Sequence, residues 1–171
     1  MMKLLHQQLV DLLYFRFYQL HMLLDMNKDL DGNDVNSDDI FSSNNVTVIN
    51  FWFTTCNPCV GELGDLEKLN KELAEKGGTV IGINSFTLDG DKTAISDAKN
   101  VLSKKGITYK NIWFDSKSEA GKFTSGLYSY PTKYVVDKNG NIVGQPIVGA
   151  ITSSSGITPN VLNTLWDIYA R

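Results

Sequence analysis

Residues 46–59 decide the fold, and they read VTVINFWFTTCNPC. The first eight, residues 46–53, are mostly β-branched or aromatic, which is typical of a strand buried on both faces. Residues 54–55 then lead to Cys56 and Cys59, the only cysteines in the chain. The two cysteines therefore follow directly after a buried strand.

A helical pattern comes next, over residues 60–76, and Gly77-Gly78 terminates it. Its apolar side chains recur on one face: Leu63, Leu66, Leu69 and Leu73. Cys56 would then lie at the helix N-terminus, where unpaired backbone N–H groups and the helix dipole favour an anion. We expect the pKa of the Cys56 thiol to fall there and Cys59, one turn later and more buried, to stay protonated. This arrangement favours thiol–disulfide exchange.

The rest of the chain alternates between strand and helix patterns. In chain order we predict a strand over 79–86, a helix over 91–105, a strand over 111–114, a helix over 116–124, strands over 132–136 and 142–148 joined by a turn at 138–141, and a helix over 161–169. Alternation first and a hairpin last predict an α/β fold, in which a central mixed sheet has helices on both faces.

Length and composition favour one globular domain. The chain has 171 residues, 42% of them hydrophobic, with a net charge of −3 and a pI of about 5.3. No basic excess indicates binding to nucleic acid. Two cysteines three positions apart do not cross-link a scaffold, and a zinc site would need His6 and His21 to fold back over them. We expect neither a metal nor a cofactor.

Residues 1–24 have leucines at three- and four-residue steps, which predicts an amphipathic helix. Polar and charged residues interrupt it, so it does not resemble a signal peptide or a membrane span. The helix would pack on the domain or on another subunit, anchor the protein peripherally to a membrane, or lie outside the fold. We therefore divide the chain into an N-terminal segment, 1–28, and a domain, 29–171.

An acidic loop over residues 27–38 has two interpretations. Oxygen-bearing side chains at alternate positions and Gly32 at the sixth resemble an EF-hand or dockerin calcium loop. The loop departs from that pattern with Asn27 at position one, Asp34 at eight and Asp38 at twelve. Asp31-Gly32-Asn33 is also typical of a tight hairpin turn, which we favour.

The segment from Asn50 to Cys59 resembles the active-site segment of the thioredoxin superfamily, and more closely that of the TlpA/ResA-like extracytoplasmic thiol–disulfide oxidoreductases. Further matches accompany it: Asp29–Val35 is similar to the family's N-terminal hairpin, Glu62 to its acidic residue near the thiols, and Tyr130-Pro131-Thr132 with Val135–Gly140 to its cis-proline loop and following hairpin. The resemblance covers residues 29–171 and implies a thioredoxin-like fold.

The resemblance also implies roles for individual residues. Glu62 would accept the proton of Cys59, although an exposed helix residue with an ordinary surface contact would also fit its position. Pro131 would be cis and lie against the cysteines, and the backbone of Tyr130 would pair with an extended substrate segment. Asn57 and Pro58 would complete the substrate-binding surface.

Three other positions qualify the resemblance. Asn50 stands where thioredoxin has a buried Asp, which leaves proton transfer to Glu62. Thr55 stands where relatives have Trp, so an aromatic lip of the substrate groove is missing. We interpret Trp52 as a packing residue.

The resemblance therefore implies a thiol–disulfide oxidoreductase that exchanges electrons with protein disulfides, with an upstream thiol partner, in an extracytoplasmic or membrane-associated location. The uncharged Asn57-Pro58 pair favours the reducing direction. A thiol peroxidase on the same fold would need Pro and Thr where the chain has Ile49 and Phe53. A non-catalytic or metal-binding thioredoxin-like module is the remaining alternative.

Overall fold

The computed structural model describes residues 27–151, and their strands form one seven-stranded sheet in the order β2-β1-β5-β4-β3-β6-β7. The strands in chain order are β1 (Asn27–Asp29), β2 (Asp34–Val35), β3 (Val46–Trp52), β4 (Gly78–Asn84), β5 (Asn111–Trp113), β6 (Thr132–Asp137) and β7 (Ile142–Val148). Strands β3, β4 and β5 are parallel, whereas β1, β2, β6 and β7 pair antiparallel with their neighbours. The mixed sheet and its C-terminal hairpin are confirmed.

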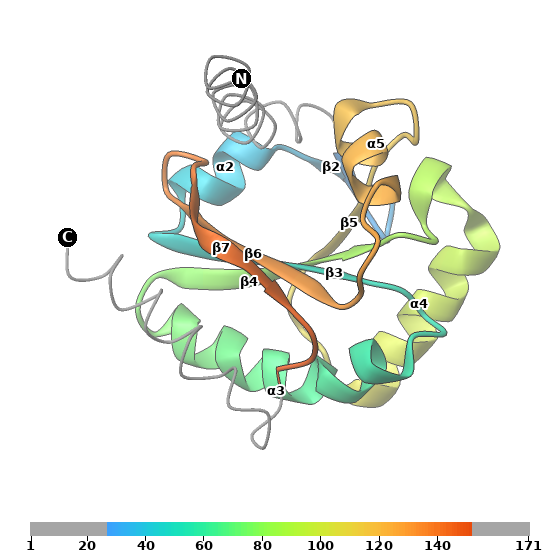
Figure 1. The fold of residues 1–171 in the computed structure, drawn as a ribbon, viewed down its shortest axis with the longest axis horizontal. Coiled ribbons are helices and arrows are strands. Elements are labelled where there is room, and N and C mark those ends of the chain that lie inside the picture. Colours follow the sequence, from blue (N-terminus) through green and yellow to red (C-terminus); the bar gives the residue numbers. More distant parts are fainter. Residues whose placement is uncertain (1–26, 152–171) are drawn as a thin grey trace, which may run out of the picture.

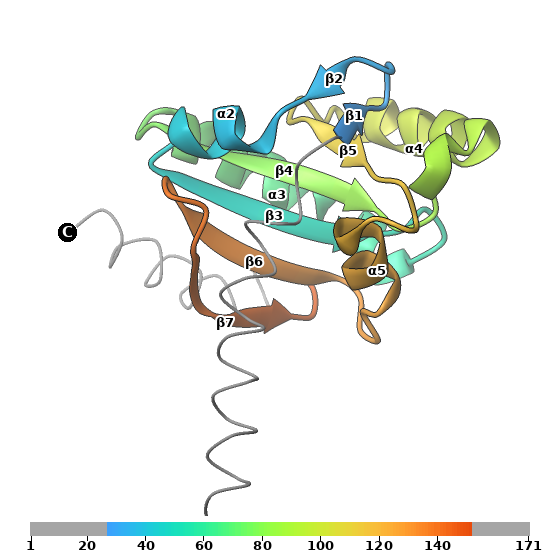
Figure 2. The same ribbon diagram turned by 90° about the horizontal axis from the view of Figure 1, so that it is seen from above.

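Helices cover both faces of this sheet. They are α2 (Ser37–Ser42), α3 (Asn57–Ala74), the 3-10 helix η1 (Leu88–Gly90), α4 (Lys92–Lys105) and α5 (Glu119–Ser125). Figure 1 shows α3 and α4 below the sheet and α2 and α5 above it. Figure 2, turned by 90°, shows β3 and β4 side by side in the middle of the layer. The predicted α/β, thioredoxin-like architecture is confirmed.

Strand β3 is buried over its whole length and separates one hydrophobic cluster on one face of the sheet from two on the other. Successive strand residues face opposite sides, so Ile49 and Phe51 pack toward α2 and α5, and Val48 and Trp52 pack toward α3 and α4. All four predicted leucines of α3 are buried. The strand that carries the cysteines at its end is therefore fixed from both faces.

The acidic loop forms the hairpin between β1 and β2. Asp29 Oδ1 accepts hydrogen bonds from the backbone N–H groups of Asp31 and Asn33, both at 2.9 Å. Gly32 has a φ of 87°, a conformation that side chains disfavour, so glycine suits this turn. The preferred turn interpretation is confirmed.

Several predicted boundaries need correction. Helix α3 begins at Asn57 rather than at residue 60, β4 ends at Asn84, and α5 begins at Glu119. Helix α2 was not predicted, because six residues that begin with Ser-Asp-Asp give no helical periodicity. Strand β1 also includes Asn27 and Lys28, which the sequence division placed in the N-terminal segment.

The helices predicted over 1–24 and 161–169 lie outside the described residues, so the division of the chain and the membrane contact stay predictions. Among residues 27–151, no helix has both the length and the apolarity needed to cross a bilayer.

Candidate active site

Cys56 and Cys59 form a disulfide at the N-terminus of α3. Cys56 is the N-cap residue, and its sulfur accepts a hydrogen bond of 3.2 Å from the Cys59 backbone N–H. Cys59 is fully buried and Cys56 is 6% exposed, while Asn57 and Pro58 between them are exposed. An anion on Cys56 would meet the same N–H group and the positive end of the helix dipole.

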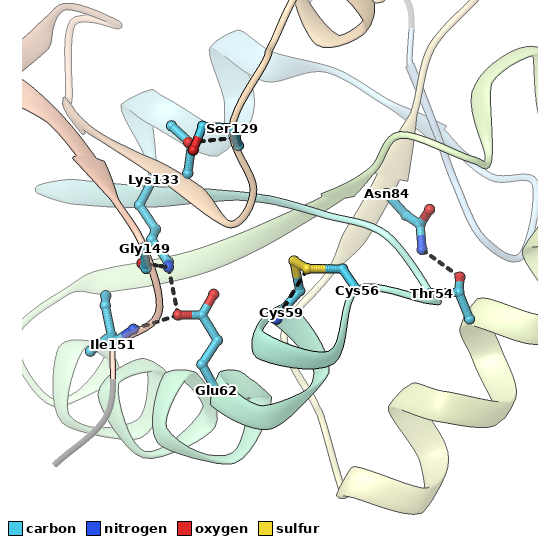
Figure 3. The surroundings of a disulfide bond; sticks show 10 residues. Thr54, Cys56, Cys59, Glu62, Asn84, Ser129, Lys133, Gly149 and Ile151 are labelled. Atoms are coloured by element: carbon cyan, nitrogen blue, oxygen red, sulfur yellow. Dashed lines mark hydrogen bonds and ion pairs between the residues drawn. A yellow bond between two sulfur atoms is a disulfide. The ribbon is translucent and has the colours of Figure 1, made fainter. Parts of the chain in front are cut away.

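The loop before the cysteines is tied to the end of β4. Thr54 Oγ1 accepts a hydrogen bond of 3.0 Å from the Asn84 side chain, and the Ser85 N–H donates to the Trp52 carbonyl. These contacts hold the strand-to-helix turn in place (Figure 3). Trp52 is fully buried and its indole N–H donates to Asn111 Oδ1 at 2.9 Å, which agrees with a packing role.

Glu62 is fully buried on α3, three residues after Cys59, so the alternative of an exposed surface residue is wrong. Its Oε2 accepts hydrogen bonds from Lys133 Nζ at 2.5 Å and from the Ile151 N–H at 2.6 Å. Its Oε1 has no hydrogen-bond partner among the described residues. In Figure 3 this second oxygen lies on the side of the disulfide. The carboxylate is thus anchored through one oxygen only.

Lys133 is also fully buried, and its ammonium donates a second hydrogen bond, of 2.7 Å, to the Gly149 carbonyl. Burial raises the pKa of Glu62, and the positive charge and hydrogen bond of Lys133 oppose that rise. Burial likewise lowers the pKa of Lys133, and the Glu62 carboxylate opposes that fall. Each charge therefore depends on the other for its ionised form.

A row of polar residues crosses the sheet on the face that α3 covers. Lys133 on β6 lies opposite Asn50 on β3, Asn50 lies opposite Gly82 on β4, and Gly82 lies opposite Asn111 on β5. Residues opposite one another on adjacent strands point to the same face. A Cβ at Gly82 would lie 2.0 Å from Asn111 Oδ1, so only glycine lets that side chain cross β4 toward Trp52. The Asn50 amide is fully buried, and neither of its polar atoms has a partner among residues 27–151.

The peptide bond between Tyr130 and Pro131 is cis, as the resemblance implied. Pro131 is buried, and its carbonyl accepts a hydrogen bond of 2.9 Å from the Gly149 N–H. The Tyr130 hydroxyl donates to the Thr124 carbonyl at 2.8 Å, and its ring packs against the cluster that contains both cysteines. The structure therefore brings Tyr130 to the cluster that contains the disulfide, while the contact of Pro131 with the cysteines stays a prediction.

Three aromatic side chains meet at the end of β3, and two of them, Phe53 and Tyr130, pack against the cluster that contains both cysteines. The Phe53 ring stacks on Phe86, with 4.9 Å between centroids, and meets Tyr130 edge-on at 5.2 Å. Phe86 is 49% exposed. Although Thr55 provides no aromatic lip, Phe86 places an exposed ring on Phe53, in the segment that leads to Cys56, from the end of a different strand.

Sequence reasoning missed Lys133 and Phe86. A charged residue within the apolar run of β6, two positions after a candidate cis-proline, was a signal for Lys133. Phe53 and Phe86 each follow the carboxyl end of a parallel strand, and such ends meet at one edge of a sheet. The other contacts of the Glu62–Lys133 pair are backbone groups, the Gly149 carbonyl at Lys133 and the Ile151 N–H at Glu62, and these leave no pattern in the sequence. Among residues 27–151, no group of three or more His, Cys, Asp or Glu side chains is arranged to hold a metal ion.

The fold, with a redox-capable cysteine pair at a helix N-terminus, defines this protein as thioredoxin-like. The model of the AhpC/TSA family matches residues 21–145, so the chain belongs to that family.

Comparisons with individual proteins agree with this assignment. The chain is 31% identical over 124 residues to the thiol-disulfide oxidoreductase ResA of Bacillus thuringiensis (strain Al Hakam). That match covers 72% of this chain and 65% of the length of the relative. This chain is also 30% identical over 105 residues to the thioredoxin-like protein YneN of Bacillus subtilis. That match covers 61% of this chain and 57% of YneN.

Solved structures share the fold. The chain superimposes on a structure described as a thiol:disulfide interchange protein DsbE from Chlorobium tepidum with a TM-score of 0.64 and 23% identity, covering 84% of this chain and 94% of that one. The fold is therefore the same over most of the described residues.

Proposed function

We propose that this protein is a thiol–disulfide oxidoreductase that exchanges electrons with protein disulfides through Cys56 and Cys59. The observation that carries the proposal is the position of Cys56, whose sulfur accepts the Cys59 N–H at the start of an 18-residue helix. That environment stabilises a thiolate, which is the reactive form in disulfide exchange. The relatives named thiol-disulfide oxidoreductase support the same chemistry.

In the reducing direction, the Cys56 thiolate attacks a disulfide of the substrate protein, and one substrate sulfur leaves as a thiolate. Cys59 then gives its proton to Glu62 and bonds to the Cys56 sulfur. The mixed disulfide breaks and the second substrate sulfur leaves as a thiolate. The substrate gains two electrons and the Cys56–Cys59 pair loses them, so an upstream thiol partner must reduce the pair again.

Glu62 is the proton acceptor in this proposal because its Oε1 is buried, has no hydrogen-bond partner among residues 27–151 and is carried on the same helix three residues after Cys59. The exposed Asn57 and Pro58, together with the backbone of Tyr130 before the cis Pro131, form the surface for an extended substrate segment. Phe86 and Phe53 add an apolar contact at its margin.

The alternative of a thiol peroxidase is disfavoured by the side chains at positions 49 and 53. Ile49 is buried in the core between the sheet and α2 and α5, and Phe53 packs against Phe86 and Tyr130. Neither position offers a hydroxyl group that could bind a peroxide.

Trapping of mixed disulfides tests the proposal. Cys59→Ser should accumulate adducts of Cys56 with substrate proteins, because the resolving thiol is gone, and mass spectrometry would identify both the attachment site and the partners. Cys56→Ser is the matched control and should trap far fewer. Adducts that are equally abundant in both variants, or absent from Cys59→Ser, would refute the exchange mechanism.

The reduction potential tests the direction. A reducing pair should equilibrate with glutathione near the thioredoxin value of about −270 mV. A value near about −120 mV, typical of a strongly oxidising pair, would contradict the reductase assignment while leaving disulfide exchange intact.

A further inference from the structure

Lys133 is a buried charge for which the exchange steps above have no role. It lies on β6, two residues after the cis-proline, and is fully buried together with Glu62. A buried ion pair is costly to maintain, because both charges lose their hydration. A cation at this depth, directly behind the carboxylate next to the cysteines, therefore needs an explanation beyond stability.

The hydrogen bonds at Glu62 are unequal, and this inequality is informative. Lys133 Nζ and the Ile151 N–H both bind Oε2, whereas Oε1 has no partner among the described residues. Both lone pairs of Oε2 therefore already accept hydrogen bonds, and Oε1 is the oxygen that can take a proton. Figure 3 shows Oε1 on the disulfide side of the carboxylate and Lys133 on the far side.

We propose that Lys133 is a positioning residue of the exchange site, which acts through Glu62 by keeping its carboxylate ionised and leaving Oε1 as the proton-accepting atom. This inference rests on the proposed function. Without a cation behind it, a buried carboxyl group becomes neutral and cannot accept a proton. With Lys133 present, the proton of Cys59 can move to Oε1 while the positive charge remains nearby to balance the new thiolate.

The other groups around Glu62 do not replace Lys133. Asp65 on the same helix raises the pKa of Glu62, as burial does. Tyr109, in the segment before β5, has its pKa raised by burial and by Glu62 and Glu67, so it stays neutral. Asn50, opposite Lys133 on β3, carries no charge. Of the side chains that face Glu62 within residues 27–151, Lys133 alone brings a positive charge.

The resolving step can be measured by itself with 5,5′-dithiobis(2-nitrobenzoate). Reduced Cys56 attacks the reagent, releases one coloured thiolate and retains the other as a mixed disulfide. Cys59 then gives up its proton, bonds to Cys56 and releases the second thiolate, so the late absorbance phase reports this step. Its rate should not depend on reagent concentration.

In the parent protein, the rate of the late phase should rise with pH as Glu62 ionises. Lys133→Met should move the midpoint of that rise upward by about one to three pH units, the effect of an opposite charge at hydrogen-bond distance. Lys133→Arg, which retains the charge, should leave the midpoint at or below that of the parent. Lys138→Met, an exposed lysine in the turn after the same strand, is the control and should leave the midpoint unchanged.

Two results would overturn the inference. One is an unchanged midpoint in Lys133→Met. The other is an upward shift of the midpoint in Lys133→Arg, which would indicate that the shape of the lysine side chain matters rather than its charge. If Lys133→Met does not fold, carboxyl NMR of Glu62 in Lys133→Arg and the parent decides, since a higher pKa in the variant contradicts the proposal. Failure of the proposed function looks different: the parent itself would then show no late phase, or its mixed disulfide would not form on Cys56.

Discussion

Helix α3 buries two glutamates, five residues apart, in opposite ways. Glu67 uses both carboxylate oxygens on Thr108: Oε2 accepts the backbone N–H at 2.9 Å and Oε1 accepts the hydroxyl at 2.6 Å. Glu62 places two donors on one oxygen and leaves the other without a partner among the described residues. Glu67 is hydrogen-bonded by neutral groups and pairs with an exposed lysine, Lys71, at 3.7 Å, whereas Glu62 is held by a buried cation.

The difference would separate a structural carboxylate from the proton acceptor that we propose. Hydrogen bonds to both oxygens of Glu67 fix the segment before β5 against α3. Glu62 has, on the side of the cysteines, an oxygen without a hydrogen-bond partner in the described part of the chain, and a single proton would change the charge balance of its pair with Lys133. Burial alone therefore does not distinguish the two, and the distribution of donors does.

Replacing the lysine that pairs with each glutamate should produce the largest difference between the two sites in the free energy of unfolding. Lys133→Met should cost about 3–5 kcal/mol of the free energy of unfolding near neutral pH, because it leaves a buried charge without its partner. Lys71→Met removes a lysine that is 70% exposed and 3.7 Å from Glu67, and should cost less than about 1 kcal/mol. Urea denaturation of both variants measures the difference.

The pH dependence of the Lys133→Met deficit has a defined sign. Burial raises the pKa of Glu62 in the folded protein, so folding favours its protonated form. The destabilisation should be small at about pH 4, where the carboxyl is protonated, and grow as the pH rises through the raised pKa. A deficit that is constant with pH, or a Lys71→Met variant as unstable as Lys133→Met, would remove the distinction between the two glutamates.

Removing both members of the buried pair should have the opposite effect on stability. Replacement of Glu62 by Leu and Lys133 by Met leaves no buried charge, and such exchanges are neutral or stabilising by about 1–4 kcal/mol. The same variant should lose the late absorbance phase governed by Glu62. Thermal unfolding and the thiol assay together test it, and a double variant less stable than Lys133→Met would show that the pair is needed for packing.

The sequence predicted the scaffold of this site better than its charges. The run 46–53 is mostly β-branched or aromatic, so a buried strand followed by the cysteines was the expected structure. Glu62 also followed a visible pattern, since Cys59, Glu62, Leu66 and Leu69 recur at three- and four-residue steps on one helix face. A charged residue on a buried helix face was a detectable signal.

The partners of Glu62 could not be predicted in this way. Lys133 reaches α3 because β6 pairs with β3 in a register that sets it opposite Asn50, and strand register depends on the whole sheet. The Ile151 and Gly149 contacts come from backbone groups after β7, whose placement no side-chain pattern encodes. Sequence therefore identified the candidate proton acceptor, and only the assembled sheet identified what holds it.

Glu67→Gln should separate the two glutamates by function. The amide can accept only through its oxygen, so one of the two Thr108 donors faces an NH₂ group, which should cost about 1–3 kcal/mol. The midpoint of the late phase in the thiol assay should not move, because Glu67 is not in the exchange site. A shifted midpoint with Glu67→Gln would mean that both carboxylates influence Cys59.

Tyr109→Phe should change stability the least. It tests whether the buried Tyr109 hydroxyl interacts with either glutamate. The Tyr109 hydroxyl is buried without a hydrogen-bond partner among the described residues, and both Glu62 and Glu67 raise the pKa of its phenol. Removing an unpartnered buried hydroxyl should leave stability unchanged or raise it by less than about 1 kcal/mol. The midpoint of the late phase should stay that of the parent, since a neutral phenol contributes no charge at Glu62. A loss of stability, or a moved midpoint, would show that the hydroxyl interacts with one of the carboxylates, and the glutamate whose substitution abolishes that effect would be its partner.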